Sequence, residues 1–196
     1  MDDAREAAQA KGALRSAIRQ SRAQRTSNKD DAARIAQHVL DIAEVQHACS
    51  RGLPVACYVS RSEEPSTDVL RARLVEAGAV LLLPRIDGDD LVWVRATPDT
   101  RWTVNRWGID EPTGPAFEGT PSVWLIPALA IDADGYRLGQ GGGFYDRALR
   151  DIAEDTSVIA IVFEDEVVER VPRESHDHRV DVVVTPERVR WLSMPD

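Results

Sequence analysis

The sequence lacks the features of secreted, membrane-spanning and nucleic-acid-binding proteins. Its only cysteines, Cys49 and Cys57, match no zinc or CxxC spacing, which indicates reduced, buried thiols in a cytoplasmic protein. No apolar run approaches the length of about 18 residues that a membrane span needs, and the charged N-terminus has no signal-peptide core. The net charge of −9 argues against a broad nucleic-acid surface. We therefore expect a cytoplasmic monomer that binds neither membranes nor nucleic acid.

Lysine is scarce, because only Lys11 and Lys29 occur among many arginines. Lys11 begins a row that continues with Arg15, Arg19 and Arg22, and this spacing places the row on one face of a helix. Such a row is commonly a solvated helix face. In an acidic protein, however, one concentrated cationic stripe is also a candidate for binding a polyphosphate.

Apolar runs alternate with helical patterns, which predicts an α/β protein with a mostly parallel sheet covered on both faces. Strands are expected at 54–59, 79–84, 91–96, within 122–132, and at 157–163, 180–185 and 188–192. Helices are expected at 3–24, 29–48, 67–77 and from 144 to about 155, whereas the Pro- and Gly-containing residues 97–121 are expected to be loop.

The chain contains no linker long enough to separate two domains. We therefore expect residues 1–196 to form one domain, with N-terminal helices at 3–48 packed on it. Ligands of such sheets bind beyond the carboxyl ends of the strands. The loops after Pro84, Pro127 and Thr185 should then lie near one another.

A glycine-rich stretch, RLGQGGGFYDRAL, occupies residues 137–149. Its glycines lie between a predicted strand and a predicted helix, where bare N–H groups approach an anion closely and the helix N-terminus adds about half a positive charge. The stretch is not a Walker A loop, since Gly-Lys-Ser/Thr is missing, and it is no persuasive dinucleotide fingerprint. A flexible loop without a ligand explains the glycines alone equally well. The glycines are Gly139, Gly141, Gly142 and Gly143.

The neighbours of these glycines favour a phosphate site. Arg137 offers a bidentate fork to a phosphate. Asp146 falls one turn into the helix, where it is either a magnesium ligand or a carboxylate favoured by the helix dipole. Phe144 and Tyr145 either stack on a planar ligand or pack against the sheet.

A second group of polar residues precedes the strand expected at 180–185. His176, Asp177 and His178 resemble a zinc cluster only superficially, because two histidines on a loop seldom form a site without more ligands. Asp181 is either a second carboxylate for magnesium or an acid at a strand edge.

Six segments together resemble the 5-formyltetrahydrofolate cyclo-ligase family, and the resemblance covers nearly the whole chain. No single segment would suffice, but the fourth and fifth, in this order and spacing, are quite specific. The segments are KGALR near the start, CYVSRSEEPST, LLLPRI, WGIDEP at 107–112, LIPALAIDADGYRLGQGGGFYDR at 125–147, and HDHRVDVVVT at 176–185.

This resemblance implies a three-layer α/β sandwich related to sugar-phosphate isomerase and CoA-transferase domains. It also implies a magnesium- and ATP-dependent closure of 5-formyltetrahydrofolate to 5,10-methenyltetrahydrofolate, with release of ADP and phosphate. Lys11 and Arg15 would contact the ATP phosphates, and catalysis would rest on Arg137 and Lys11. Arg137 with the loop from Gly139 through Gln140 to Phe144 would wrap the triphosphate.

The remaining roles implied by the resemblance concern magnesium and the folate. Asp146 and Asp181 would hold magnesium. Glu64 would contact the pterin, with Trp107 and Tyr145 lining the folate pocket.

Three positions depart from the family pattern. Phe144-Tyr145 replaces a common Tyr-Tyr pair, and Gln140 stands where a basic or aromatic residue is frequent. A proline in EEPST leaves open whether Glu63 or Glu64 contacts the folate. None of these departures removes the arginine, the glycines or either aspartate.

Our mechanistic hypothesis is that ATP phosphorylates the formyl oxygen on N5 and that N10 then attacks the activated carbon. Phosphoryl transfer needs positioning and charge stabilisation rather than a nucleophilic side chain. Two alternatives remain, a non-catalytic module that binds nucleotide or folate, and a sugar-phosphate enzyme on a similar sheet. The cationic N-terminal helix and both aspartates speak against them.

Overall fold

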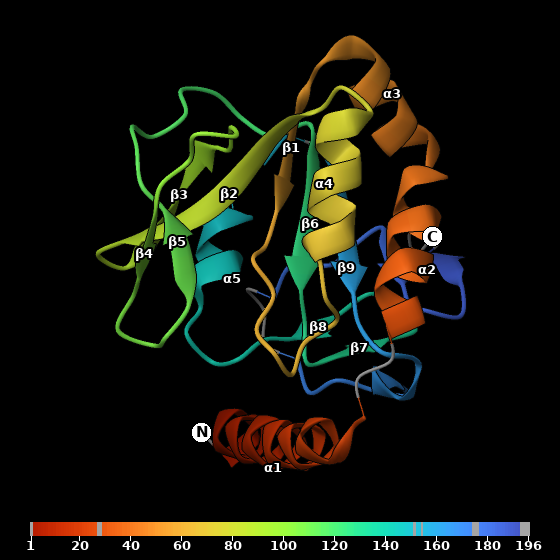
Figure 1. Ribbon diagram of the computed structural model, residues 1–196. Helices are drawn as coiled ribbons and strands as arrows, with labels where there is room; N and C mark the ends of the chain where they lie inside the picture. Colours follow the sequence, from red (N-terminus) through yellow and green to blue (C-terminus); the bar gives the residue numbers. More distant parts are fainter. Residues whose placement is uncertain (1, 27–28, 151, 154, 174–176, 193–196) are drawn as a thin grey trace.

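The computed structural model describes residues 2–26, 29–150, 152–153, 155–173 and 177–192 (Figure 1). At its centre a sheet of parallel strands contains β1 (Pro54–Cys57), β2 (Val80–Asp87), β6 (Val123–Pro127), β9 (Ser157–Ile161) and β11 (Val182–Val184). Antiparallel strands β3 (Asp90–Arg95) and β12 (Val189–Trp191) form its two edges. The order of the seven strands is β12-β11-β9-β6-β1-β2-β3, which confirms the mostly parallel sheet.

Helices cover both faces of this sheet and complete a three-layer sandwich (Figure 1). Val55 and Cys57 face the core under the helices of one layer, whereas Ala56, between them, faces the core on the other side. Because both faces are buried, the strands read as continuous apolar runs rather than as alternating ones. The first layer contains α2 (Lys29–Leu40), α3 (Ala43–Arg51) and α4 (Asp68–Glu76), and α5 (Phe144–Ala148) lies on the opposite face.

Three of the expectations about secondary structure are wrong. The helix expected at 29–48 is broken into α2 and α3, because Ile42 adopts an extended conformation while its side chain stays fully buried. The segment 97–121 contains a hairpin of two short strands, β4 (Trp102–Val104) and β5 (Asp110–Pro112). Helix α5 has only five residues. The missed strands carry no alternating apolar pattern, so nothing in their sequence distinguished them from a loop.

The long N-terminal helix α1 (Asp2–Gln24) lies apart from the other helices, across the carboxyl-terminal edge of the sheet (Figure 1). It packs through Leu14 and Ile18 on a small second sheet. That sheet consists of β10 (Val167–Val168), β7 (Ala130–Asp132) and β8 (Arg137–Leu138). Helix α1 and the start of the glycine-rich stretch are therefore fixed to one platform.

The turn between β7 and β8 is held by one carboxylate. Asp132 Oδ1 accepts hydrogen bonds from the N–H groups of Asp134 and Tyr136, at 3.0 Å each. Gly135 has a φ of +87°, and a Cβ there would lie 2.8 Å from the Val180 carbonyl oxygen. The turn thus requires glycine, and it directs Arg137 toward the carboxyl end of the main sheet.

Strand β1 lies between β2 and β6, so the chain moves to one side of β1 first and to the other side later. Such a switch point opens a crevice at the carboxyl ends of the two neighbouring strands, where α/β sheets bind ligands. Pro84 and Pro127 both line the cavity found there, as expected. Thr185 does not line it, and its hydroxyl donates instead to Glu164.

Both cysteines are free and buried, as the sequence predicted. Burial raises the pKa of the Cys57 thiol to about 12, so this sulfur stays protonated at neutral pH and is a poor nucleophile. None of the described helices has the length and apolar character of a membrane span.

Candidate functional site

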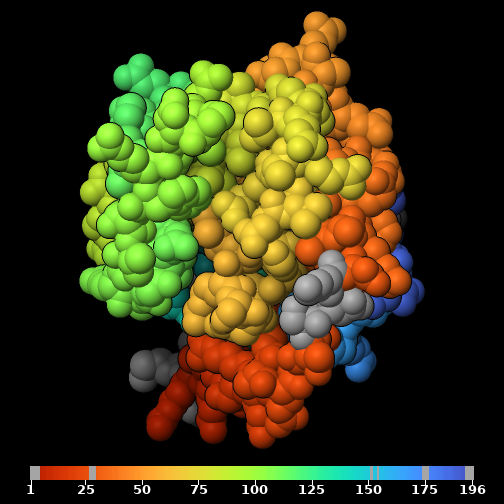
Figure 2. Space-filling model, in the orientation of Figure 1, coloured from red at the N-terminus to blue at the C-terminus, as the bar shows by residue number. Residues whose placement is uncertain are grey.

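A cavity of about 510 Å³ opens at the switch point, between α1 and the carboxyl ends of the strands. Its walls include residues of α1, the segment 58–67 after β1, strands β2, β3 and β6, the β4–β5 hairpin, α5, and residues 139–143, here called the glycine loop. Figure 2 shows α1 across one end of the molecule, with the segment after β1 directly above it and the hairpin to one side of that segment. Residues distant in sequence thus surround one space.

Two cations in the cavity are paired with carboxylates. Lys11 Nζ lies 2.8 Å from Asp177 Oδ2, and both side chains are 8% exposed. Arg137 Nη2 lies 2.6 Å from Asp146 Oδ1, and its Nη1 donates to the His178 carbonyl at 3.2 Å. Arg137 and Asp146, predicted from neighbouring positions of one motif, therefore bind each other directly.

Two further cations hold carbonyl groups of the glycine loop. Arg15 Nε donates to the Gly139 carbonyl at 2.9 Å. Arg19 donates from Nη2 to the backbone oxygen of Gln140 at 3.0 Å and to its Oε1 at 2.9 Å. The cationic face of α1 is therefore turned toward the glycine loop, and Gln140 provides the amide that fixes Arg19.

Within the described part of the chain, the N–H groups of the glycine loop have no hydrogen-bond acceptor. Within the described residues, the amides of 139–143 donate no hydrogen bond to backbone or side chain, although the loop carbonyls are held by arginines. Gly141 and Gly143 have φ values of +102° and +68°, which only glycine adopts without strain. Successive free amides beside a helix N-terminus form an anion-binding concavity. The loop therefore offers donors to a ligand rather than to the protein.

Glu64 lies at the other end of the cavity, in the segment after β1. Its Oε2 accepts the Arg61 N–H at 3.0 Å. The segment itself is fixed by the Tyr58 hydroxyl, which donates to the Pro65 carbonyl at 2.8 Å. Glu63 is paired instead with the Arg61 guanidinium and is absent from the cavity lining that the structure describes. The structure thus favours Glu64 over Glu63 as the side chain that faces a ligand.

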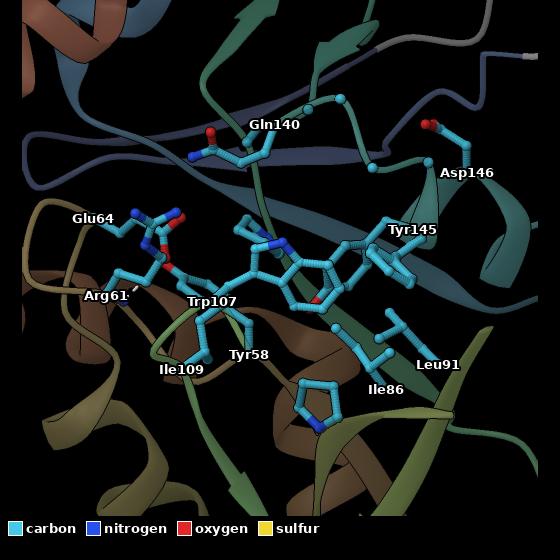
Figure 3. Close-up of a pocket in the computed structure, with 18 of the residues that line it drawn as sticks. Tyr58, Arg61, Glu64, Ile86, Leu91, Trp107, Ile109, Gln140, Tyr145 and Asp146 are labelled. Atoms are coloured by element: carbon cyan, nitrogen blue, oxygen red, sulfur yellow. Dashed lines mark hydrogen bonds between the residues drawn. The ribbon is translucent and has the colours of Figure 1, made fainter. Parts of the chain in front are cut away.

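Aromatic and aliphatic side chains fill the space between Glu64 and the glycine loop (Figure 3). The rings of Trp107 and Phe144 meet edge to face, with centroids 5.8 Å apart. Burial raises the pKa of the Tyr145 hydroxyl far above its usual range, so Tyr145 offers a neutral O–H. Ile86 and Leu91 line the same region. The middle of the cavity therefore suits a flat, largely apolar ring system.

Trp107 is positioned by a network that sequence reasoning missed. Asn105 Oδ1 accepts the N–H groups of Trp107 and Ile109, and its Nδ2 donates to Glu111 Oε1 at 2.8 Å. Glu111 Oε1 also accepts the Ile86 N–H at 3.1 Å, which ties the hairpin to β2. Asn105 and Glu111 both occur in the segment 97–121, which reads as a loop, and no periodic pattern there indicated that they have a structural role.

Arg22 and Asp181, both singled out from the sequence, do not lie with the other polar groups. Arg22 is buried and forms an ion pair with Glu166, at 2.6 Å. Asp181 begins β11 at the amino end of the strands, where its carboxylate accepts the Val158 N–H at 2.8 Å. It does not line the described cavity. His176, part of the zinc cluster that the sequence argued against, lies outside the described residues.

Carboxylates of the cavity fit magnesium only together with a phosphate. Among the described residues, no group of three or more His, Cys, Asp or Glu side chains is arranged to hold a metal ion. Mg²⁺ is commonly bound by one or two carboxylates plus phosphate oxygens rather than by an all-protein cage. Asp146, which is one-third exposed at the cavity wall, meets that requirement if its bond to Arg137 opens.

Comparisons with known proteins agree with this geometry. The model of the 5-formyltetrahydrofolate cyclo-ligase family matches residues 7–186. A 5-formyltetrahydrofolate cyclo-ligase of Mycolicibacterium smegmatis is 39% identical over 147 residues, which cover 70% of this chain and 75% of the relative. The Escherichia coli K12 protein of the same name is 32% identical over 143 residues, covering 69% and 79%.

A solved structure has the same fold over nearly its whole length. The NMR structure of Aquifex aeolicus 5,10-methenyltetrahydrofolate synthetase superposes with a TM-score of 0.80 at 26% identity, covering 95% of this chain and 94% of that one.

Replacing Gly141 with alanine tests whether the loop conformation matters for anion binding. Ala at a φ of +102° is strained by about 1–3 kcal/mol, so the loop relaxes and its amides diverge. We expect Gly141→Ala to weaken tripolyphosphate binding about tenfold, measured by isothermal titration calorimetry. Gly52→Ala is the matched control, because Gly52 has a φ of +63° but lies outside the cavity. Equal affinities of the Gly141→Ala variant and the parent would contradict the assignment.

Proposed function

The chain belongs to the 5-formyltetrahydrofolate cyclo-ligase family and is an enzyme of that class, and from this premise we propose how its cavity performs the reaction. The reaction is the ATP-dependent cyclisation of 5-formyltetrahydrofolate to 5,10-methenyltetrahydrofolate, with release of ADP and phosphate. The glycine-loop end of the cavity takes the ATP triphosphate, and the end at Glu64 takes the pterin. Membership of this family argues against the two alternatives, a non-catalytic binding module and a sugar-phosphate enzyme.

One observation carries the proposal. Lys11, Arg15, Arg19 and Arg137 line one cavity together with a loop whose amides have no acceptor in the described chain. Such a concentration of donors suits an anion that has several charges and many oxygen atoms. The same cavity continues to Trp107 and Glu64, so a triphosphate and a flat folate ring fit end to end.

In the proposed chemistry, the formyl oxygen on N5 attacks the γ-phosphorus while the bond to the ADP oxygen breaks. The product is an iminium phosphate, in which the former formyl carbon is electrophilic. N10 then attacks this carbon and loses its proton, and the carbon–oxygen bond breaks to release phosphate. The transferred group carries its charge on peripheral oxygens, so catalysis consists of orientation and neutralisation.

Two of the cations change their partners when ATP binds. Arg137 and Lys11 leave Asp146 and Asp177 for phosphate oxygens, and Arg137 neutralises the group in transfer. Arg15 is within reach of the same phosphates from the loop carbonyl that it now binds. Because the guanidinium groups are already held in place, little side-chain entropy is lost on binding.

Magnesium supplied with ATP would neutralise part of the phosphate charge. We propose Asp146 as its protein ligand, since this carboxylate becomes available when Arg137 turns to the phosphates. Asp181 is left out of the proposed site, because it is bound to Val158 at the opposite edge of the sheet.

Three broader expectations from the sequence remain predictions. We propose that the chain acts as a monomer, in the cytoplasm, and as one domain whose N-terminal helices complete the cavity. Helix α1 supports the last point, because it supplies Lys11, Arg15 and Arg19.

Arg137→Ala is expected to lower kcat for cyclisation by about 10³-fold or more, because the transferring phosphoryl group loses its main counter-charge. The rise in methenyltetrahydrofolate absorbance measures the rate, and thermal melting verifies that the variant is folded. Arg150→Ala removes an exposed arginine outside the cavity and should leave kcat unchanged. A folded Arg137→Ala variant with near-normal turnover would show that the assigned role is wrong.

Asp146→Asn and Asp181→Asn distinguish the two carboxylates. We expect Asp146→Asn to raise the magnesium concentration for half-maximal activity about tenfold or more, since the amide is a weaker ligand for a hard cation. Asp181→Asn should lower the melting temperature only, because its carboxylate serves the fold. Titration of activity with magnesium at saturating ATP measures the first effect, and thermal melting measures the second. If Asp181→Asn raised the magnesium requirement and Asp146→Asn did not, Asp181 would be the metal ligand instead.

A further inference from the structure

Arg22 is the most deeply buried cation of α1, with 1% of its side chain exposed. Its Nε and Nη2 donate to the two oxygens of Glu166, at 2.6 and 2.8 Å. Nη2 also donates to the Ala128 carbonyl at 2.7 Å. Among the described residues, Nη1 has no hydrogen-bond partner. A buried guanidinium nitrogen without a partner is costly, so a reason for its orientation is needed.

The free nitrogen points toward the folate end of the cavity. Nη1 lies 3.9 Å from Glu64 Oε1, and the Glu64 side chain is only 7% exposed. One guanidinium therefore lies between two nearly buried carboxylates. Glu166 is bound to it through both oxygens, whereas Glu64 is attracted to it without a direct hydrogen bond. The positive charge of Arg22 attracts the Glu64 carboxylate and offsets part of the cost of burying it.

The other oxygen of Glu64 is held by the backbone. Oε2 accepts the Arg61 N–H, and Arg61 belongs to the segment that Tyr58 fixes through Pro65. Within the described chain, Arg22 is the only charged partner of Oε1. The direction of the carboxylate in the cavity thus depends on Arg22, a residue that does not itself line the cavity.

We propose that Arg22 is a positioning residue, which holds the Glu64 carboxylate aimed at the 2-amino and N3–H donors of the pterin ring. The inference rests on the proposed function. A carboxylate fixed in one orientation binds two parallel N–H donors at little cost in ordering, whereas a mobile one does not. Arg22 therefore acts on folate affinity and not on the nucleotide.

The variants are chosen so that loss of folding is not mistaken for loss of positioning. Arg22→Met alone leaves Glu166 buried with its charge uncompensated, which destabilises the protein. The double variant R22M/E166Q removes both charges, and E166Q alone is its reference. Arg25→Met is the matched control, because Arg25 follows Arg22 by three residues, just beyond the end of α1, pairs with Asp165 and does not line the cavity.

The experiment measures kcat and the KM of each substrate for these variants. We expect R22M/E166Q to raise the KM for 5-formyltetrahydrofolate about tenfold or more over E166Q, with the KM for ATP within about twofold. Arg22→Lys should recover part of the loss, since it keeps the charge. R25M should match the parent in both constants.

A double-mutant cycle with Glu64→Gln gives the second readout. If Arg22 acts through Glu64, the Arg22 change in an E64Q/E166Q background raises the folate KM by less than about twofold. An undiminished effect of the Arg22 substitution in that background would overturn the inference. Equal shifts of both KM values, or an unchanged folate KM, would also overturn it. An inactive parent protein would instead contradict the proposed function, so the two failures are distinguishable.

Discussion

The structure depends on one electrostatic constraint, which is that several cations must lie close together at the carboxyl edge of the sheet before any anion is present. Lys11 and Arg137 are neutralised by Asp177 and Asp146, while Arg15 and Arg19 hold carbonyl oxygens of the glycine loop. These internal partners reduce like-charge repulsion and keep each cation oriented. The site is therefore preorganised for a polyanion and is balanced in its absence.

Most of these cations belong to helix α1, whose cationic side chains act in two different ways. Three successive positions on its face hold the glycine loop and Asp177, and the fourth, Arg22, turns inward to Glu166 and faces Glu64. Apolar packing of Ile18 on the small sheet sets the helix in place. The proposed nucleotide end and the proposed folate end of the cavity thus share one support.

The sequence predicted the elements whose pattern is local. The parallel strands, the glycine loop and the row on α1 were readable because apolar runs, glycines and a helical spacing each mark their structure directly. The β4–β5 hairpin was missed, since its register depends on Asn105 and Glu111 rather than on periodicity. Equally, no spacing could separate Arg22 from Arg19, because burial against Glu166 is a tertiary contact.

A crystal structure with a non-hydrolysable ATP analogue and magnesium is the most direct measurement of the central claim. The account predicts phosphate oxygens within hydrogen-bond distance of the amides of residues 141–143, with Arg137 turned from Asp146 to the γ-phosphate. A triphosphate bound elsewhere, or one bound here while the Arg137–Asp146 and Lys11–Asp177 pairs stay intact, would contradict it.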